Sequence, residues 1–205
     1  MRKFVSTVSL IALFAFALTA SAAPMPPGQN KLQCFDGPSE LTIYGGACTL
    51  QGNGARGPAT LTLDGTDPDG DYAGVYILDS TVYGRLLTDV TKLSYNYTAS
   101  VIPQPGNLSY NLPIDSDANG SSDFYLFVDA FYCPGTDGTI NIVSNPNCGV
   151  WAGGVTFYAN WAAFVAAYPG AKVATDAYVF IVAERTPSEP AATYTVNAVK
   201  FGTVN

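Results

Sequence analysis

The stretch TKLSYNYT, residues Thr91–Thr98, alternates polar and apolar side chains along its length. Leu93, Tyr95 and Tyr97 fall on one side of an extended chain, and polar side chains fall on the other. This period of two is typical of a β-strand with one buried and one solvent-facing side. Residues Asn107–Leu112 repeat the pattern. The sequence therefore predicts half-buried strands and a mainly β protein.

Other short β-favouring runs lie between turn-forming residues. We expect strands at 41–44, 59–63, 72–78, 91–98, 108–114, 124–132, 139–143, 155–158, 178–183 and 193–201. Short strands at this spacing are typical of a sandwich or barrel, and we predict a two-sheet antiparallel β-sandwich of jelly-roll type. Residues 178–182 are apolar at every position, which predicts a central strand buried between the other sheet and a helix.

One segment has helical periodicity instead. Its apolar side chains recur at spacings of three and four residues, at Trp161, Phe164, Val165 and Tyr168. Asn160 is a suitable N-cap, and Pro169-Gly170 ends the pattern. We predict one short amphipathic helix near 160–168, with Trp161 packed against the sandwich.

The N-terminus has the composition of a secretory signal peptide. Arg2 and Lys3 precede an apolar run that ends near Leu18, and small residues follow up to Ala22. The apolar run is short for a bilayer span. We predict a signal peptide at 1–22, a flexible Pro-rich leader at 23–33, and a single domain at 34–205. The expected location is extracellular, without a membrane or lipid anchor.

Charge and cysteine content narrow the partners and the compartment. Without Arg2 and Lys3, seven basic residues face sixteen acidic ones, a net charge of about −9. This charge argues against nucleic acid and anionic membranes as partners. Four cysteines in an exported chain favour disulfides, because the chain has no histidine and no CxxC spacing for zinc. Of the three possible pairings we prefer the local one, which joins Cys34 to Cys48 and Cys133 to Cys148.

Three sequons are candidate N-glycosylation sites, at Asn96, Asn107 and Asn119. Asn96 and Asn107 fall on the polar side of their predicted strands, which is where a glycan must attach. Both are therefore expected to carry surface glycans in a host that glycosylates secreted proteins.

The loop PIDSDANGSSD, Pro113–Asp123, has the spacing of a calcium loop. Asp115, Asp117, Asn119 and Asp123 supply oxygen atoms at alternating positions, and Gly120 permits the sharp turn. Leu126 occupies the place of the usual bidentate carboxylate. Three interpretations stay open: a polar turn, a calcium site, or a glycan on Asn119.

A second acidic loop, Asp64–Asp71, has similar character and lies between two predicted strands. If both loops lie at one end of the sandwich, they could share an ion. Independent solvated turns are the alternative.

Aromatic side chains beside a carboxylate suggest a sugar site. On the strand that begins at Phe124, one side carries Tyr125, Phe127 and Asp129. Rings stack on the C–H faces of sugars, and a carboxylate accepts hydrogen bonds from hydroxyl groups. The alternative is that the helix covers this face as a second core layer. Trp151, in a glycine-flanked loop after Cys148, is either a further stacking residue or a plug at the end of the sandwich.

Several short motifs together resemble a group of secreted microbial proteins. They are Leu93-Ser-Tyr95, Asn111-Leu-Pro-Ile-Asp115, Asp117-Ala-Asn-Gly120, Asn160-Trp-Ala-Ala-Phe164, Tyr168-Pro169 and Val199-Lys-Phe-Gly202. Proteins of this group look like lectin-like or carbohydrate-binding-module-like jelly rolls, and most have no assigned activity. The resemblance covers residues 58–203. It implies the fold and carries over no catalytic residue.

These patterns predict a secreted, non-catalytic module that binds a polysaccharide or another glycan, or is associated with a cell wall, with calcium as the only candidate cofactor. One alternative is an effector-like protein that binds a protein target. The other is a glycan-cleaving enzyme that pairs Asp129 with Asp123, Asp176 or Glu184. The absence of histidine excludes a histidine-dependent triad.

Overall fold

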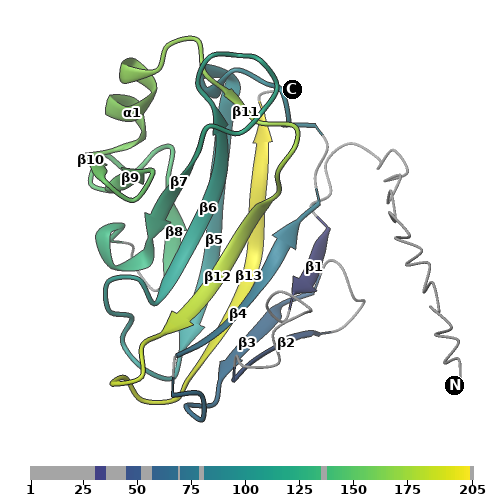
Figure 1. Cartoon of the computed structure of the whole chain (residues 1–205), viewed down its shortest axis with the longest axis vertical. Coiled ribbons are helices and arrows are strands. Elements are labelled where there is room, and N and C mark those ends of the chain that lie inside the picture. Colours follow the sequence, from purple (N-terminus) through teal and green to yellow (C-terminus); the bar gives the residue numbers. More distant parts are fainter. Residues whose placement is uncertain are drawn as a thin grey trace, which may run out of the picture.

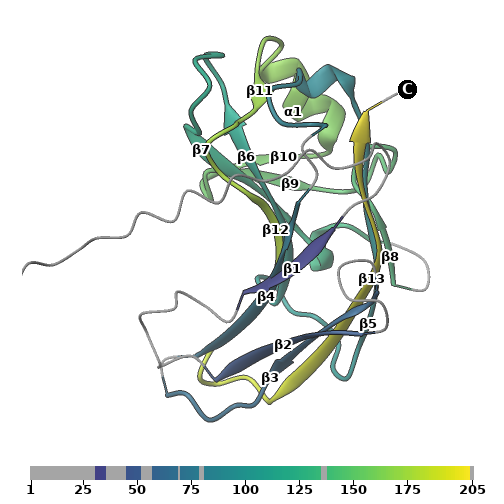
Figure 2. The same ribbon diagram turned by 90° about the vertical axis from the view of Figure 1, so that its right-hand side faces the viewer.

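The computed structural model describes residues 31–35, 45–51, 57–68, 70–78, 81–134 and 138–203. In these ranges the chain forms two antiparallel β-sheets packed face to face, with one α-helix (Figures 1 and 2). The mainly β fold and the sandwich are therefore confirmed. The predicted signal peptide and most of the predicted leader lie outside the described residues, as does the strand expected at 41–44.

The larger sheet has eight strands in the order β1-β4-β12-β6-β7-β9-β10, with β11 paired to β6. Their bounds are β1 Leu32–Phe35, β4 Asp71–Ile77, β6 Leu108–Asp115, β7 Phe124–Asp129, β9 Val150–Ala152, β10 Thr156–Tyr158, β11 Lys172–Val173 and β12 Val179–Arg185. The strand β1 includes the last two residues assigned to the leader.

The smaller sheet has five strands in the order β2-β3-β13-β5-β8. Their bounds are β2 Gly46–Leu50, β3 Ala59–Leu63, β5 Val90–Ala99, β8 Thr139–Asn141 and β13 Ala192–Thr203. Across the two sheets, β3 pairs with β13 and β4 pairs with β12. This nested pairing of early with late strands is compatible with a jelly roll, which stays a prediction.

The core lies between the two sheets and follows the alternation seen in the sequence. In β5, Leu93 and Tyr95 are buried, whereas Lys92 and Thr98 are exposed. The ring of Tyr95 stacks on Tyr110 of the larger sheet, with centroids 6.2 Å apart. Such contacts between alternate residues of facing sheets are what holds a sandwich together.

The strand β6 differs from the prediction of a half-buried strand. All eight of its residues are buried, including Ser109 at 7% exposure and Asn111 at 1%. Its polar side is covered because β12 and β7 flank it and place large aromatic side chains beside it. The sequence of β6 alone carries no sign of this cover.

The predicted helix is α1, Trp161–Ala167, and it begins where expected, because the Asn160 side chain accepts a hydrogen bond from the Ala163 N–H at 2.9 Å. Trp161 is buried, as predicted. The ring of Phe164 packs on Tyr158, and the ring of Tyr168 packs on Phe124.

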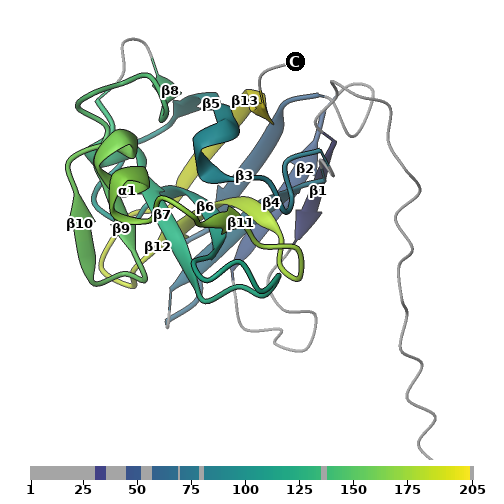
Figure 3. The same cartoon turned by 90° about the horizontal axis from the view of Figure 1, so that it is seen from above.

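The helix does not cover the outer side of β12. Tyr158 and Phe124 are paired with the buried residues Val150 and Ile114, so α1 packs on the inner side of the larger sheet. Figures 2 and 3 show it at one end of the molecule, beside β9 and β10 and toward the smaller sheet. The strand β12 is central, between β4 and β6, but its outer side faces aromatic rings rather than a helix.

Both predicted disulfides are confirmed. Cys34 of β1 is bonded to Cys48 of β2, which joins the larger sheet to the smaller one. Cys133 is bonded to Cys148 between β7 and β9. The two closed loops have sequence separations of 14 and 15.

Candidate functional site

The outer side of the larger sheet carries a line of aromatic side chains. Residues directly opposite each other in antiparallel strands point to the same side of the sheet. The cross-strand partners run from Tyr76 to Phe180, then to Asn111, Phe127, Trp151 and Phe157. We call these six residues the aromatic row.

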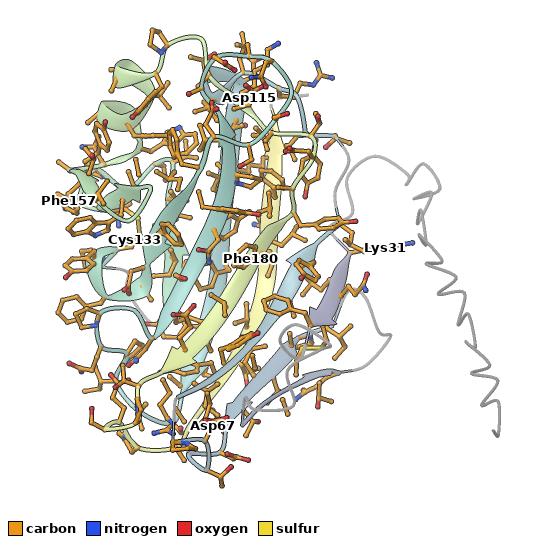
Figure 4. The ribbon with its side chains drawn as sticks, viewed as in Figure 1. Lys31, Asp67, Asp115, Cys133, Phe157 and Phe180 are labelled. Carbon is orange, nitrogen blue, oxygen red and sulfur yellow. A yellow bond between two sulfur atoms is a disulfide. The ribbon has the colours of Figure 1, made fainter. Side chains whose placement is uncertain are left out.

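The row crosses six neighbouring strands, β4, β12, β6, β7, β9 and β10. Neighbouring strands lie about 4.8 Å apart, so five steps give a length of about 24 Å. Figure 4 places Phe180 near the middle of the sheet and Phe157 toward its β10 edge. The row is thus long enough to contact several sugar rings of one chain.

Adjacent rings extend the row on both sides. Tyr125 contacts Phe180 at 5.4 Å and Phe127 at 6.5 Å between ring centroids. At the β4 end, Tyr76 contacts Phe35 at 4.5 Å and Tyr178 at 5.2 Å. These contacts pack the rings against one another and extend the aromatic surface beyond the row.

The rings remain accessible to solvent. Phe157 is 48% exposed and Tyr178 is 52% exposed. Phe180, Phe127 and Trp151 are partly buried. The alternative that the helix covers this side as a second core layer is therefore wrong, because α1 packs on the inner side.

The structure brings together three of the four residues predicted to bind sugar. Tyr125 and Phe127 lie on neighbouring positions of the same side of β7, and Phe127 is the cross-strand partner of Trp151. Trp151 lies in β9 rather than in an irregular loop, and its ring contacts Phe157 at 5.0 Å. It is part of the outer surface and does not plug the end of the sandwich.

Asp129 serves a structural purpose instead. It is 6% exposed and caps the 3₁₀ helix η2, Ala130–Tyr132, by accepting the Phe131 N–H at 2.8 Å. Its other oxygen accepts the Gly106 N–H. Burial raises the pKa of Asp129, although these two hydrogen bonds act in the opposite direction. Both oxygens are engaged, so Asp129 is poorly placed to accept a sugar hydroxyl.

Of the three carboxylates considered as catalytic partners of Asp129, Glu184 is the one whose pKa is raised by desolvation of the carboxylate and further by the charge of Asp129. Glu184 lines a cavity of about 310 Å³ at one end of the sandwich, together with Val101, Ile102, Gln104, Asn107, Arg185, Glu189, Pro190, Ala192 and Tyr194. Of this pair, the backbone holds both oxygens of Asp129.

The predicted calcium loop gathers three carboxylates. Oxygen atoms of Asp115, Asp117 and Asp123 all lie within 4.8 Å of one another. Asp115 also accepts the backbone N–H groups of Asn119 and Gly120, at 3.0 and 2.8 Å. The loop is therefore already a closed turn, and it has the oxygen ligands that calcium prefers.

The second acidic loop lies at the opposite end of the molecule. Figure 4 shows Asp115 near one end of the sheet and Asp67 near the other, so the two loops do not share an ion. Asp71 forms a buried ion pair with Arg185 at 2.6 Å. Burial alone would raise the pKa of Asp71, but the hydrogen bonds from Arg185 and from the Gly65 and Asp67 N–H groups hold it below its ordinary value.

The candidate glycosylation sites differ in accessibility. Asn119 is exposed and Asn96 is partly exposed. Asn107 is only 6% exposed, and its side-chain nitrogen donates to the Glu184 carbonyl at 3.2 Å and to Glu189 at 3.1 Å. The expectation that Asn107 lies on an open polar surface is wrong, because its side chain ties the β5–β6 connection to the β12–β13 connection.

Sequence reasoning missed four residues of the aromatic row, namely Tyr76, Asn111, Phe157 and Phe180. Alternation assigns each of them to a side of its own strand, but only the pairing of distant strands aligns them.

In the described ranges no helix is long and apolar enough to cross a membrane. No protein-family model matches the chain, and no curated protein is significantly similar to it in sequence.

Proposed function

We propose that this protein is a secreted, non-catalytic module that binds a glycan on the outer side of its larger sheet. The observation that carries the proposal is the aromatic row, which spans six strands and presents five partly exposed rings, with Asn111 in place of a ring on β6. Flat rings stack on the apolar C–H faces of sugars, and a row of them binds an extended chain by repeating that contact.

The proposal of secretion rests on two observations. The N-terminal sequence has the pattern of a signal peptide. The two disulfides are expected in an oxidising compartment, such as the outside of a cell.

In this proposal, calcium bound in the Asp115–Asp123 loop would support the glycan-binding surface indirectly. The Asp115–Asp123 loop is joined to the segment before β12, because Thr175 Oγ1 donates to the Gly120 carbonyl at 2.8 Å and Ser122 N–H donates to Asp176 at 2.9 Å. Tyr178 follows directly, beside the row. An ion in the loop would stiffen this segment without touching the sugar.

The experiment is retention of the purified protein on insoluble chitin, cellulose and β-glucan. We expect retention on at least one of them, with Tyr125→Ala and Trp151→Ala each retained less at unchanged folding. Ile102→Ala is the matched control, because it shortens a side chain that is 82% exposed and lies off the row. Normal retention of both row variants would remove these residues from the site.

Two other functions are outcomes of the same experiment. Absence of retention, together with capture of one specific protein, would favour the protein-binding alternative. Release of soluble sugar that stops in Glu184→Gln would favour the glycan-cleaving alternative.

A further inference from the structure

The centre of the aromatic row is a polar side chain. Asn111 lies in β6 with Phe180 as its partner on one side and Phe127 on the other. It is 1% exposed. Buried carboxamides normally have hydrogen-bond partners for both their nitrogen and their oxygen.

Only the nitrogen end of Asn111 is satisfied. Nδ2 donates to the Ser109 carbonyl at 3.2 Å and to Ser109 Oγ at 2.9 Å. The Ser109 carbonyl can only accept a hydrogen bond, so it places the amide nitrogen of Asn111 toward Ser109. Oδ1 is buried and has no hydrogen-bond partner among the described residues. A buried acceptor without a donor is unfavourable, and a ligand hydroxyl would remove that penalty.

The surroundings of Asn111 suit a sugar rather than a charged group. Phe180 and Phe127 are two strands apart, about 10 Å. The ring of Tyr125 contacts both of them. Asn111 lies beneath these rings, which leave it only 1% exposed. A sugar ring has apolar faces that suit the aromatic rings and a hydroxyl edge that suits the carboxamide below them.

The acidic groups near the row argue against an anionic ligand. None of the six residues of the row is charged, and the charged groups near it that affect its surroundings, Asp129, Asp176 and Glu184, are acidic. A polysaccharide that carries carboxylates or sulfates would meet like charge from these groups.

We propose that Asn111 accepts a hydrogen bond from a ligand hydroxyl at the centre of the row, and that the ligand is a neutral polysaccharide. Sugar rings stack on Phe180 and Phe127. Between them one hydroxyl, entering as the rings part, donates its hydrogen to Asn111 Oδ1. This inference rests on the proposed function and makes Asn111 a specificity-determining residue rather than a structural one.

The test is electrophoresis of the protein through native gels that contain a soluble polysaccharide. The probes are hydroxyethyl cellulose, mixed-linkage β-glucan and galactomannan, with polygalacturonate as the anionic comparison. Asn111→Leu keeps the approximate shape and removes the acceptor. Asn197→Leu, on the outer side of the smaller sheet, is the matched control.

We expect at least one neutral polysaccharide to retard the wild-type protein and the control equally. Asn111→Leu should bind that polysaccharide about tenfold more weakly, which corresponds to one lost hydrogen bond. Its melting temperature should stay close to that of the wild type, because the substitution also removes a buried unsatisfied acceptor. A methylated form of the same polysaccharide, which lacks hydroxyl hydrogens, should retard the wild-type protein less, and this comparison needs no variant.

The outcomes separate the two proposals. If no neutral polysaccharide retards the wild type, the proposed function fails and this inference fails with it. If one does, and both Asn111→Leu and methylation leave the retardation unchanged, the role of Asn111 is refuted while glycan binding stands. Stronger retardation by polygalacturonate would refute the neutral ligand.

Discussion

The disulfide between Cys133 and Cys148 is predicted to stabilise the fold and to position one end of the aromatic row. Both sulfur-bearing side chains are fully buried. Next to the bond, the Gly149 N–H donates to the Tyr132 carbonyl at 2.8 Å. The ring of Tyr132 then contacts Trp151 at 6.1 Å and Phe157 at 6.2 Å. Loss of the bond should therefore loosen the rings as well as the loop.

The magnitude follows from the size of the closed loop. For a sequence separation of 15, the chain-entropy model gives about 3 kcal/mol of unfolding free energy. In a protein of this size each kcal/mol lowers the melting temperature by about 2–4 °C, so Cys133→Ala with Cys148→Ala should melt about 6–12 °C below the wild type. The pair Cys34→Ala with Cys48→Ala has a separation of 14 and should lose nearly the same amount.

The assay combines calorimetry with tryptophan fluorescence at a temperature well below both transitions. Both double variants should melt lower, but only the loss of Cys133–Cys148 should change the emission of Trp151. A melting temperature equal to that of the wild type would refute the entropic reasoning. A lowered melting temperature with unchanged emission would show that the bond does not hold the rings in place.

Three other predictions concern stability. Asp71→Asn should lower the free energy of unfolding at neutral pH, and the difference from the wild type should shrink as the pH falls below about 4. The reason is that the pKa of Asp71 is lowered in the folded protein, so its stabilising contribution is present above the unfolded pKa and is lost when the carboxylate is protonated. Urea unfolding at several pH values measures this difference, and a difference that does not change with pH would contradict the prediction. Phe164→Ala should cost about 3–5 kcal/mol in urea unfolding, because the ring is fully buried where α1 meets the sandwich, whereas Phe131→Ala, at 49% exposure, should cost much less. Calcium should raise the melting temperature of the wild type and not that of Asp117→Asn, and an equal response of both would reduce the loop to a polar turn.

Local patterns in the sequence were sufficient for much of the fold. The alternation in Thr91–Thr98 predicted β5 and its buried side, and the spacing of Trp161 and Phe164 predicted α1. The preference for local disulfides gave the correct pairing. In each case the residues that decide the structure are close together in the chain.

The sequence analysis missed β1, β2, β9 and β11, and two of these strands are very short. The strand β9 has three residues and is bounded by glycine, and β11 has two residues. Neither has enough positions to show a period. Both exist because a neighbouring strand offers backbone hydrogen bonds.

The candidate site was only partly predictable for the same reason. The side of β7 that carries Tyr125 and Phe127 followed from alternation. The alignment of Phe180 with Asn111 needs the register between strands about 70 residues apart, which no local pattern contains. The burial of Asn111 likewise comes from rings on other strands.

The measurement that most directly tests glycan binding by the aromatic row is the fluorescence of Trp151 during titration with a soluble neutral polysaccharide. The chain has two tryptophans, and Trp161 is 4% exposed and lies in the core, so a ligand on the outer side should affect Trp151 alone. We predict a shift of the emission to shorter wavelength and protection from acrylamide quenching, both absent in Trp151→Phe. A polysaccharide that binds without changing this emission, or the absence of any change with all neutral polysaccharides tested, would contradict the assignment of the row as the binding site.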